Sequence, residues 1–397
     1  SLRYTYIGIF IIMFSVISSG MVAVMTQNIG AGRPGVAYQA RQLGLAFNAV
    51  LGVIMSLFLS LGAGIILSGV GVADALMQPA KTYLQIVGGF CILNALIPIC
   101  SSYLRAFGFS KEPLYASIIG NVINFCLNAF FLFVLHKGVA GVATATVISR
   151  IINLVIVVLL GAVLVKAKQH PERESNRAVM GQIIRIGLPS ACETAIYNVS
   201  MTLVIRFLNQ MDAQGLNVTA RSYTMQITNF SYCVGAALAQ ANAIMTGWHI
   251  GAKEYDACDR GTKKAAVIGV IVAVILETVF TLCSGWIMQL FSKDPQMVSL
   301  VGKLLAIDIV LEIGRVTNLV YGQALKTSGD AVFPVVMGAC FMILCSVGGT
   351  YLFGIRLGLL AVGAYIGMTG DECVRAVGMY LRWKSGKWKE KGLVKSR

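Results

Sequence analysis

The chain has 397 residues, of which 57% are hydrophobic and only 12% are charged, and its mean hydropathy is +0.76. About a quarter of the residues of soluble domains are charged, so this composition excludes an ordinary soluble protein and indicates one built into a membrane. The net charge of +15 does not indicate nucleic-acid binding, because the basic residues collect in alternate loops between apolar stretches, as the positive-inside rule describes.

Apolar stretches follow one another along the chain, separated by short charged or Gly/Pro-rich breaks. Each is long enough for a helix that crosses a bilayer, which needs roughly 20 apolar residues. The eleven predicted spans are residues 5–28, 37–67, 79–105, 113–135, 139–165, 181–208, 221–247, 264–291, 296–326, 332–353 and 358–382. The sequence therefore predicts an all-α integral membrane protein.

The basic residues also predict an orientation. They concentrate on one side of the predicted membrane, and that side includes the C-terminal segment with its bases Arg382, Lys384, Lys387, Lys389, Lys391, Lys395 and Arg397. Loops rich in Lys and Arg stay in the cytoplasm. We therefore expect a cytoplasmic C-terminus beside anionic membrane lipids.

Two segments of the first half return in the second half. "LRAFGFSKEP" at 104–113 matches "LKTSGDAVFP" at 325–334, and "MTQNIGAGRPGVA" at 25–37 corresponds to "MTGWHIGAKEYDA" at 245–257. Self-similarity at a nearly constant spacing indicates a repeated architecture. The sequence thus predicts two related lobes.

The repeat leaves the span at 181–208 without a first-half counterpart, which would lie before residue 1. We therefore expect two six-helix repeats with the first helix absent, so that eleven of twelve helices are present. Because each half has an even number of helices, the repeats are expected to be parallel, with a pseudo-two-fold axis normal to the membrane and a central cavity. The predicted domains are an N-lobe (1–165), a charged cytoplasmic linker (166–178), a C-lobe (179–383) and a basic cytoplasmic tail (384–397).

Seven motifs along the whole chain resemble, in order and spacing, those of the multidrug and toxic compound extrusion (MATE) transporters. They are "TQNIGAG", "LRAFGFSKEP", "GVAGVATATVIS", "IGLPSACET", "GWHIGAKEYDAC", "LKTSGDAVFP" and "DECVRAVGMYLRWKSGKW". The resemblance implies a two-lobed efflux antiporter of a prokaryotic cell membrane that expels amphipathic, often cationic compounds in exchange for H⁺ or Na⁺. The expected departure from the family is the absence of the family's first helix, which carries an essential aspartate in one branch of the family.

Ionisable side chains inside the predicted helices are the candidates for ion coupling, because each costs about 2.5–3.5 kcal/mol at bilayer depth. The acids all fall in the second half: Glu193, Glu277, Asp308, Glu312, Asp371 and Glu372. The bases are Arg150, Arg315 and Arg375. The excess of carboxylates is what a proton or sodium site needs.

Glu193 is the acid that we favour for ion coupling. It follows the "GLP" of its helix, where Pro189 can free backbone carbonyls at a kink, and Tyr197 and Asn198 lie one turn further along. The alternative is a hydrogen-bonded core carboxyl group.

The remaining acids allow two interpretations each. Asp308, Glu312 and Arg315 share one helical face, so Glu312 and Arg315 form either a structural pair or part of the coupling site. Glu277 either binds the ion or makes a hydrogen bond between lobes. For the similar group of Asp371, Glu372 and Arg375, a structural role is favoured over ion binding.

The first half offers amides in place of acids. Asn121, Asn124 and Asn128 recur on one face of their helix, where they either line the cavity or bond neighbouring helices. Arg150 likewise either lines the cavity or bonds a neighbouring helix.

Two other functions compete with drug efflux. A flippase for a lipid-linked precursor would use a similar two-lobed cavity, but such carriers meet their pyrophosphate with bases, whereas acids dominate here. A membrane-embedded enzyme lacks support, because there is no HExxH motif and no phosphate-binding loop. We expect no cofactor, no bound metal other than Na⁺ at the carboxylates, no nucleic-acid partner, and a monomer in contact with membrane lipids and a small amphipathic substrate.

Overall fold

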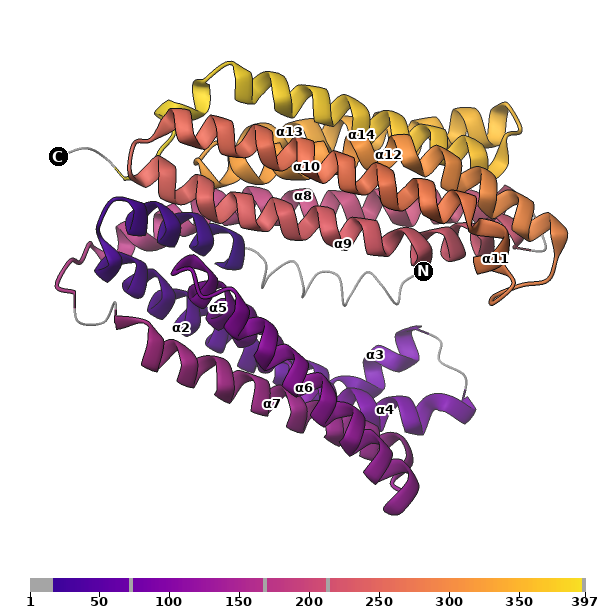
Figure 1. Cartoon of the computed structure of the whole chain (residues 1–397). Helices are drawn as coiled ribbons and strands as arrows, with labels where there is room; N and C mark the ends of the chain where they lie inside the picture. Colours follow the sequence, from indigo (N-terminus) through magenta and orange to yellow (C-terminus); the bar gives the residue numbers. More distant parts are fainter. Residues whose placement is uncertain (1–16, 71–73, 167–169, 212–214, 395–397) are drawn as a thin grey trace. The chain divides into compact units, whose positions relative to one another are not determined.

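The computed structural model describes residues 17–70, 74–166, 170–211 and 215–394, and within these ranges every regular element is a helix (Figure 1). The chain divides into two compact units, Ser1–Leu188 and Pro189–Arg397. This boundary lies inside the long helix α8 (Asn176–Met211), at its internal Pro189. The predicted all-α fold is confirmed.

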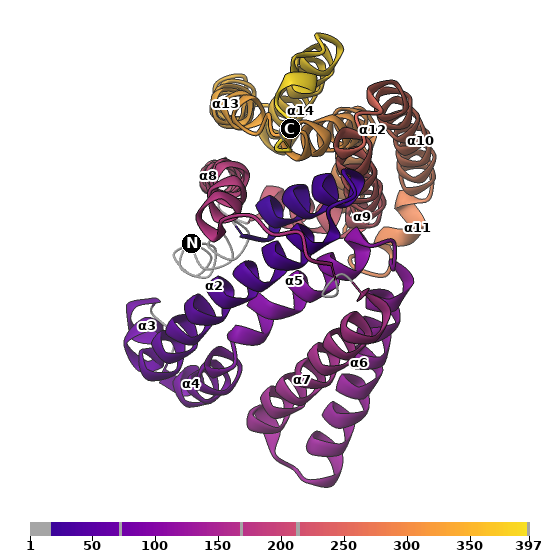
Figure 2. The same ribbon diagram turned by 90° about the vertical axis from the view of Figure 1, so that its left-hand side faces the viewer.

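The first described helix of unit 1 spans residues 17–30. It ends where Gly32 adopts a positive φ of 70°, and Pro34, fitted to the first helical turn, begins the next helix. The helices that follow are α2 (Pro34–Leu61), α3 (Ala63–Val70), α4 (Asp74–Gly89), α5 (Ile92–Ala106), α6 (Lys111–Ala129), the π-helical η1 (Phe130–Val134) and α7 (Gly138–Leu164). Helix α2 packs on α4 and α5, and α7 packs on α4, α5 and α6 (Figure 2).

The segment that follows α7 is anchored to the start of α2. Arg33 forms an ion pair with Glu174 at 2.6 Å. The Gln39 side chain donates to the carbonyl of Glu174 at 2.7 Å and accepts from its N–H at 3.0 Å. The described part of the predicted linker is therefore held against unit 1.

Unit 2 is built around one long central helix, α12. Its elements after α8 are α9 (Leu216–Gly251), α10 (Tyr255–Leu282), α11 (Ser284–Met288), α12 (Pro295–Thr327), α13 (Val332–Phe341), the π-helical η3 (Met342–Val347) and η4 (Thr350–Arg356), α14 (Leu360–Lys384) and the short 3₁₀-helix η5 (Lys387–Glu390). Helix α12 packs on α9, α10, α11, α13 and α14. The acids Asp308 and Glu312, in the middle of α12, are therefore enclosed by neighbouring helices.

Among the described residues, five helical segments are long and apolar enough to cross a membrane: α2, α6 with η1, α7, α10, and α13 through η4. The pair α4 and α5, bent by 41°, makes a sixth span if taken as one. Helices α8, α9 and α12 are also long enough, with 36, 36 and 33 residues, but carry more polar side chains. From residue 37 onward every predicted apolar stretch coincides with a described helix or with consecutive helices, whereas the start of the stretch at 5–28 lies outside the described residues.

The C-terminal segment folds back on unit 2. Trp388 stacks on Trp383 with ring centroids 4.1 Å apart, and its indole N–H donates to the Trp383 carbonyl. The Trp383 indole donates to Asp259 on α10 at 2.9 Å. Arg382 pairs with Asp330 in the turn after α12 at 2.7 Å. The described part of the predicted basic tail is thus packed onto the ends of α10 and α12.

Candidate functional site

A line of buried charged side chains runs through the interior of unit 2. It includes the candidate acids on α10, α12 and α14, and four of these are almost inaccessible: Glu277 and Glu312 are 0% exposed, and Asp308 and Asp371 are 2% exposed. Such groups cost several kcal/mol each unless they are paired or protonated. Their partners therefore decide what the site can do.

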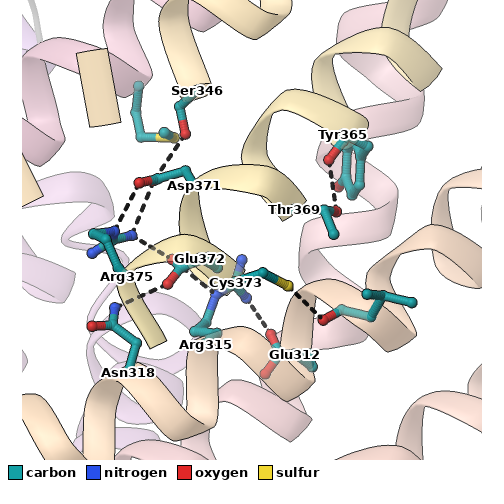
Figure 3. Close-up of polar contacts among 12 residues, drawn as sticks. Glu312, Arg315, Asn318, Ser346, Tyr365, Thr369, Asp371, Glu372, Cys373 and Arg375 are labelled. Carbon is teal, nitrogen blue, oxygen red and sulfur yellow. Dashed lines mark hydrogen bonds and ion pairs between the residues drawn. The ribbon is translucent and has the colours of Figure 1, made fainter. Parts of the chain in front are cut away.

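Two arginines pair with three acids between α12 and α14 (Figure 3). Arg375 binds both carboxylate oxygens of Asp371, at 2.8 and 3.0 Å, and reaches Glu372 at 2.9 Å. Arg315 forms an ion pair with Glu312 and lies 3.7 Å from Glu372. Asp371, Arg375, Glu372, Arg315 and Glu312 follow one another in this order, so that negative and positive side chains alternate.

Two polar side chains and one glycine complete this network. Asn318 donates to Glu372 and Ser346 donates to Asp371, each at 3.0 Å. Gly314 lets α12 and α14 approach closely, because a Cβ there would lie 2.8 Å from the backbone N of Cys373. Arg315, the next residue of α12, can therefore reach the carboxylate of Glu372 on α14.

A second group of acids, Glu277, Asp308 and Glu312, has buried oxygens without a hydrogen-bond partner. Within the described residues, both carboxylate oxygens of Glu277 and one oxygen each of Asp308 and Glu312 lack such a partner. Glu277 interacts electrostatically with both other acids and with Arg315, and it faces Ser231 of α9. This group, named here the acidic cluster, is short of positive charge and of hydrogen-bond donors.

Small residues bring the three helices around the acidic cluster together. A Cβ on Gly235 of α9 would lie 2.8 Å from Val316 of α12, and one on Gly269 of α10 would lie 2.7 Å from the same side chain. Small residues let membrane helices approach closely. The acidic cluster is consequently sealed by tight packing on its Val316 side.

Glu193 on α8 has a partner that the sequence did not reveal. Lys326, near the end of α12, lies 2.5 Å from its carboxylate. Glu193 also interacts electrostatically with Arg375, so it continues the line of charges toward the end of unit 2 that carries the C-terminal segment. Tyr197 and Asn198, on the same helix, are exposed within the structure.

In unit 1, two of the three predicted amides bond one another and a neighbouring helix. Asn124 donates to Ser149 on α7 at 3.3 Å, and Asn128 donates to Asn124 at 3.1 Å. Asn121 is exposed and Arg150 on α7 is half-buried. Asn124 thus bonds the neighbouring helix α7, which is one of the two roles that the sequence allows for these amides.

The acidic cluster suits a proton or a monovalent cation better than a multivalent metal. No set of three His, Cys, Asp or Glu side chains in the described ranges is arranged to hold a metal ion. A proton needs one carboxylate oxygen, and Na⁺ accepts carboxylates together with hydroxyl, carbonyl or water oxygens. Glu277 with Ser231 offers such a mixed set of oxygens.

An open hollow of about 690 Å³ lies among α9, α10 and α11. Its apolar lining includes Met225, Phe230, Phe280 and Phe291, and the amides Gln226 and Asn229 also face it. The rings of Phe230 and Phe280 lie 6.4 Å apart. This surface suits the apolar part of an amphipathic molecule.

Comparisons with known proteins agree with this architecture. The family model MatE matches residues 2–130 and 189–352. The chain is 32% identical to "Uncharacterized transporter YisQ" of Bacillus subtilis, over 98% of this chain and 86% of that protein. It is 22% identical to "Probable multidrug resistance protein NorM" of Thermotoga maritima, over 95% of this chain and 82% of the relative.

Solved structures show the same fold. An outward-facing multidrug resistance MATE family transporter of the MOP superfamily superposes with a TM-score of 0.87 at 17% identity, covering 98% of this chain and 88% of that one. A MATE crystal structure in the bent conformation gives a TM-score of 0.87 at 18% identity, covering 97% and 86%.

Proposed function

This chain belongs to the MatE family of transporters, and from that premise we propose that it is a secondary active antiporter that exports amphipathic, cationic compounds in exchange for H⁺ or Na⁺. Membership makes it a multi-pass membrane transporter of a multidrug efflux family, and not an enzyme. The ion, the substrate and the residues that couple them are our proposal.

The observation that carries the proposal is the acidic cluster. Glu277, Asp308 and Glu312 are buried with unsatisfied oxygens, while Arg315 is the base that pairs with one of them. A buried carboxylate that lacks a partner is stable when it is protonated or holds a cation. An ion that binds there from one side of the membrane and leaves to the other can drive export of the substrate.

The proposed substrate class follows from charge and apolar surface together. Acids outnumber arginines along the buried line of unit 2, so a cationic group is attracted to this lobe. The aromatic hollow of α9, α10 and α11 can take the apolar part of the same molecule. A carrier of a lipid-linked pyrophosphate would need the opposite charge balance.

We propose further that the protein works as a monomer in a bacterial cell membrane, with its C-terminus in the cytoplasm. The N-lobe (1–165) and the C-lobe (179–383) would move relative to each other, joined by the linker (166–178). The bases of the tail (384–397) would lie beside anionic lipids. Bacterial relatives among the transporters most similar in sequence support the membrane assignment.

The experiment that tests the proposal is dye efflux from inside-out vesicles under an imposed H⁺ or Na⁺ gradient. Glu277→Gln keeps the shape of the side chain but removes its charge, and we expect it to abolish ion-driven efflux while the protein still accumulates in the membrane. Glu390→Gln, which removes an exposed carboxylate, is the matched control. Undiminished ion-driven efflux by Glu277→Gln would exclude the acidic cluster as the coupling site.

A further inference from the structure

Arg150 is a charged side chain in a membrane-spanning helix of unit 1. It lies near the middle of α7 (Gly138–Leu164). In the part of the chain that the structure describes, it forms neither a hydrogen bond nor an ion pair. The side chain is half-buried, and its nitrogens are not among the fully enclosed polar atoms that lack a partner. The guanidinium group is therefore open to a ligand.

The packing of α7 on α5 places Arg150 beside the break between α4 and α5 (Figure 2). A Cβ on Gly161 of α7 would lie 3.8 Å from the ring of Tyr103 on α5. The two helices run in the same direction, because one span, α6 with η1, lies between them in the chain. Arg150 precedes Gly161 by three helical turns on the same face, so it lies opposite Cys91 at the start of α5. An electrostatic interaction between Arg150 and Cys91 agrees with this register.

The helices of unit 1 offer Arg150 no carboxylate partner. Residues 1–165 contain two acids, Asp74 and Glu112, which lie in the first turns of α4 and α6. Asn124 of α6 bonds Ser149, the residue before Arg150, and Glu112 lies about 18 Å from Asn124 along the helix. Asp74 lies about 24 Å along α4 from the break. Both acids are therefore too far away to pair with the guanidinium group.

Two structural roles for Arg150 disagree with its surroundings. A base that reaches toward the membrane surface lies near a helix end, but each end of α7 is about 18–21 Å from Arg150. A base can also bind carbonyl groups that a helix break sets free. Here the carbonyls of Gly88, Phe90 and Cys91 accept backbone N–H groups at 3.0, 3.1 and 2.9 Å. A costly charge at bilayer depth thus remains available for a ligand.

We propose that Arg150 is the anion-binding residue of unit 1 and receives a carboxylate, or a similar singly charged group, of the exported compound. The inference rests on the transport function proposed above, and it narrows the substrate class to amphipathic compounds that carry an anionic group as well as a cationic one. A guanidinium group binds a carboxylate through two parallel N–H···O bonds. In a low-dielectric interior this contact is stronger than in water.

Asn94 is the polar side chain that can complete the contact. It lies one turn after Cys91 on the same face of α5, and it is exposed. Its amide can donate to a carboxylate oxygen, while Arg150 supplies the positive charge. One arginine and one amide suit a single negative charge. A pyrophosphate carries more charge than this pair balances.

The test uses two forms of one rhodamine dye, the free carboxylate and its methyl ester, which share the same cationic aromatic rings. Fluorescence anisotropy measures the Kd of each form for the full chain in detergent. For the unchanged protein we expect the carboxylate form to bind about tenfold more tightly than the ester, which corresponds to about 1.4 kcal/mol. In Arg150→Met this preference should disappear, because the Kd of the carboxylate form rises about tenfold while that of the ester stays within about twofold.

Further variants separate anion binding from a structural role. Arg150→Lys keeps a positive charge but loses the planar fork, so it should retain part of the preference. Lys137→Met removes an exposed base just before α7 and should retain all of it. Equal losses of affinity for both dye forms in Arg150→Met, or unchanged Kd values, would overturn the inference. If neither Arg150→Met nor Arg150→Gln accumulates as folded protein, the inference also fails, because a side chain without a partner should be dispensable for folding.

Failure of the inference is distinguishable from failure of the proposed function, because export of the two dye forms is measured separately in vesicles under an H⁺ or Na⁺ gradient. If the unchanged protein and Arg150→Met export both forms with the same KM, the export function stands and the inference fails. If the unchanged protein exports neither form under either gradient, the proposed function fails. The anisotropy measurement then still decides whether Arg150 binds a carboxylate.

Discussion

Lys326 on α12 lies 2.5 Å from Glu193 on α8, so the acid that the sequence favours for ion coupling is held by a base from a distant helix. The pair lies toward the end of unit 2 that carries the C-terminal segment. Gly338 of α13 leaves room for it, because a Cβ there would lie 3.3 Å from Cγ of Glu193. Glu193 can therefore act as the electrostatic partner of Lys326 or as a ligand of the coupling ion, and an experiment can separate these two roles.

Exchanging the two charges distinguishes an electrostatic contact from an ion-binding role. We expect Glu193→Gln to abolish ion-coupled dye efflux while expression remains intact, because it leaves Lys326 without its partner. The double variant Glu193→Lys with Lys326→Glu restores the pair and should transport about tenfold faster than Lys326→Glu alone, as coupled neighbours do in double-mutant cycles. A double variant as inactive as the single ones would show that the carboxylate is needed on α8 itself.

Arg375 should be required for the stability of unit 2. Arg375→Met leaves Asp371 and Glu372 without their closest positive charge, and breaking a buried pair in this way costs about 3–5 kcal/mol. The measurement is the melting temperature of the purified protein in detergent, which we expect to fall. Arg356→Met is the matched control, because Arg356 is exposed and contacts the hydroxyl group of Tyr351. Equal melting temperatures for the two variants would contradict the role given to Arg375.

Trp388 should stabilise unit 2 through its contacts beyond α14. Removing a fully buried Trp side chain costs about 3–5 kcal/mol, and Trp388 is 1% exposed. We expect Trp388→Ala to lower the melting temperature and to increase protease cleavage after α14. Trp286→Ala serves as the control, because Trp286 is 71% exposed. A larger loss of stability in the control would refute the packing described for the C-terminal segment.

Phe230 should contribute to substrate binding and not to ion coupling. It lies in the apolar hollow against Phe280, so Phe230→Ala removes aromatic surface from the proposed substrate contact. We expect a several-fold rise in KM for a large aromatic dye and an unchanged half-saturating concentration of the coupling ion. A change in ion affinity without a change in KM would move Phe230 from the substrate contact to the ion site.

Local spacing was sufficient to predict the helices and part of the site. Apolar stretches of bilayer length predict helices wherever they occur. The separation of Glu312 from Arg315 and of Asp371 from Arg375 places each pair on one helical face, and both pairs form ion pairs. These features depend on residues within one or two helical turns.

Contacts between different helices could not be predicted from the spacing of residues in the sequence. Glu277 has no charged neighbour in sequence, and its proximity to Asp308 depends on how α10 packs on α12. Lys326 was missed because it lies near the end of its apolar stretch, where a base is ordinarily solvated. Its pairing with Glu193 depends on neighbouring helices that one sequence does not place.

The fold-back of the C-terminal segment has a consequence for how the protein is made. Trp388 and Leu393 are buried in unit 2, yet they are translated after all of its long helices. The indole of Trp383 and the carboxylate of Asp259 can bond before that point, but the stacking partner of Trp383 arrives later. Unit 2 therefore reaches its final packing only after its last transmembrane helix has left the ribosome, so a prematurely terminated chain would carry an incompletely packed lobe that quality-control proteases can recognise.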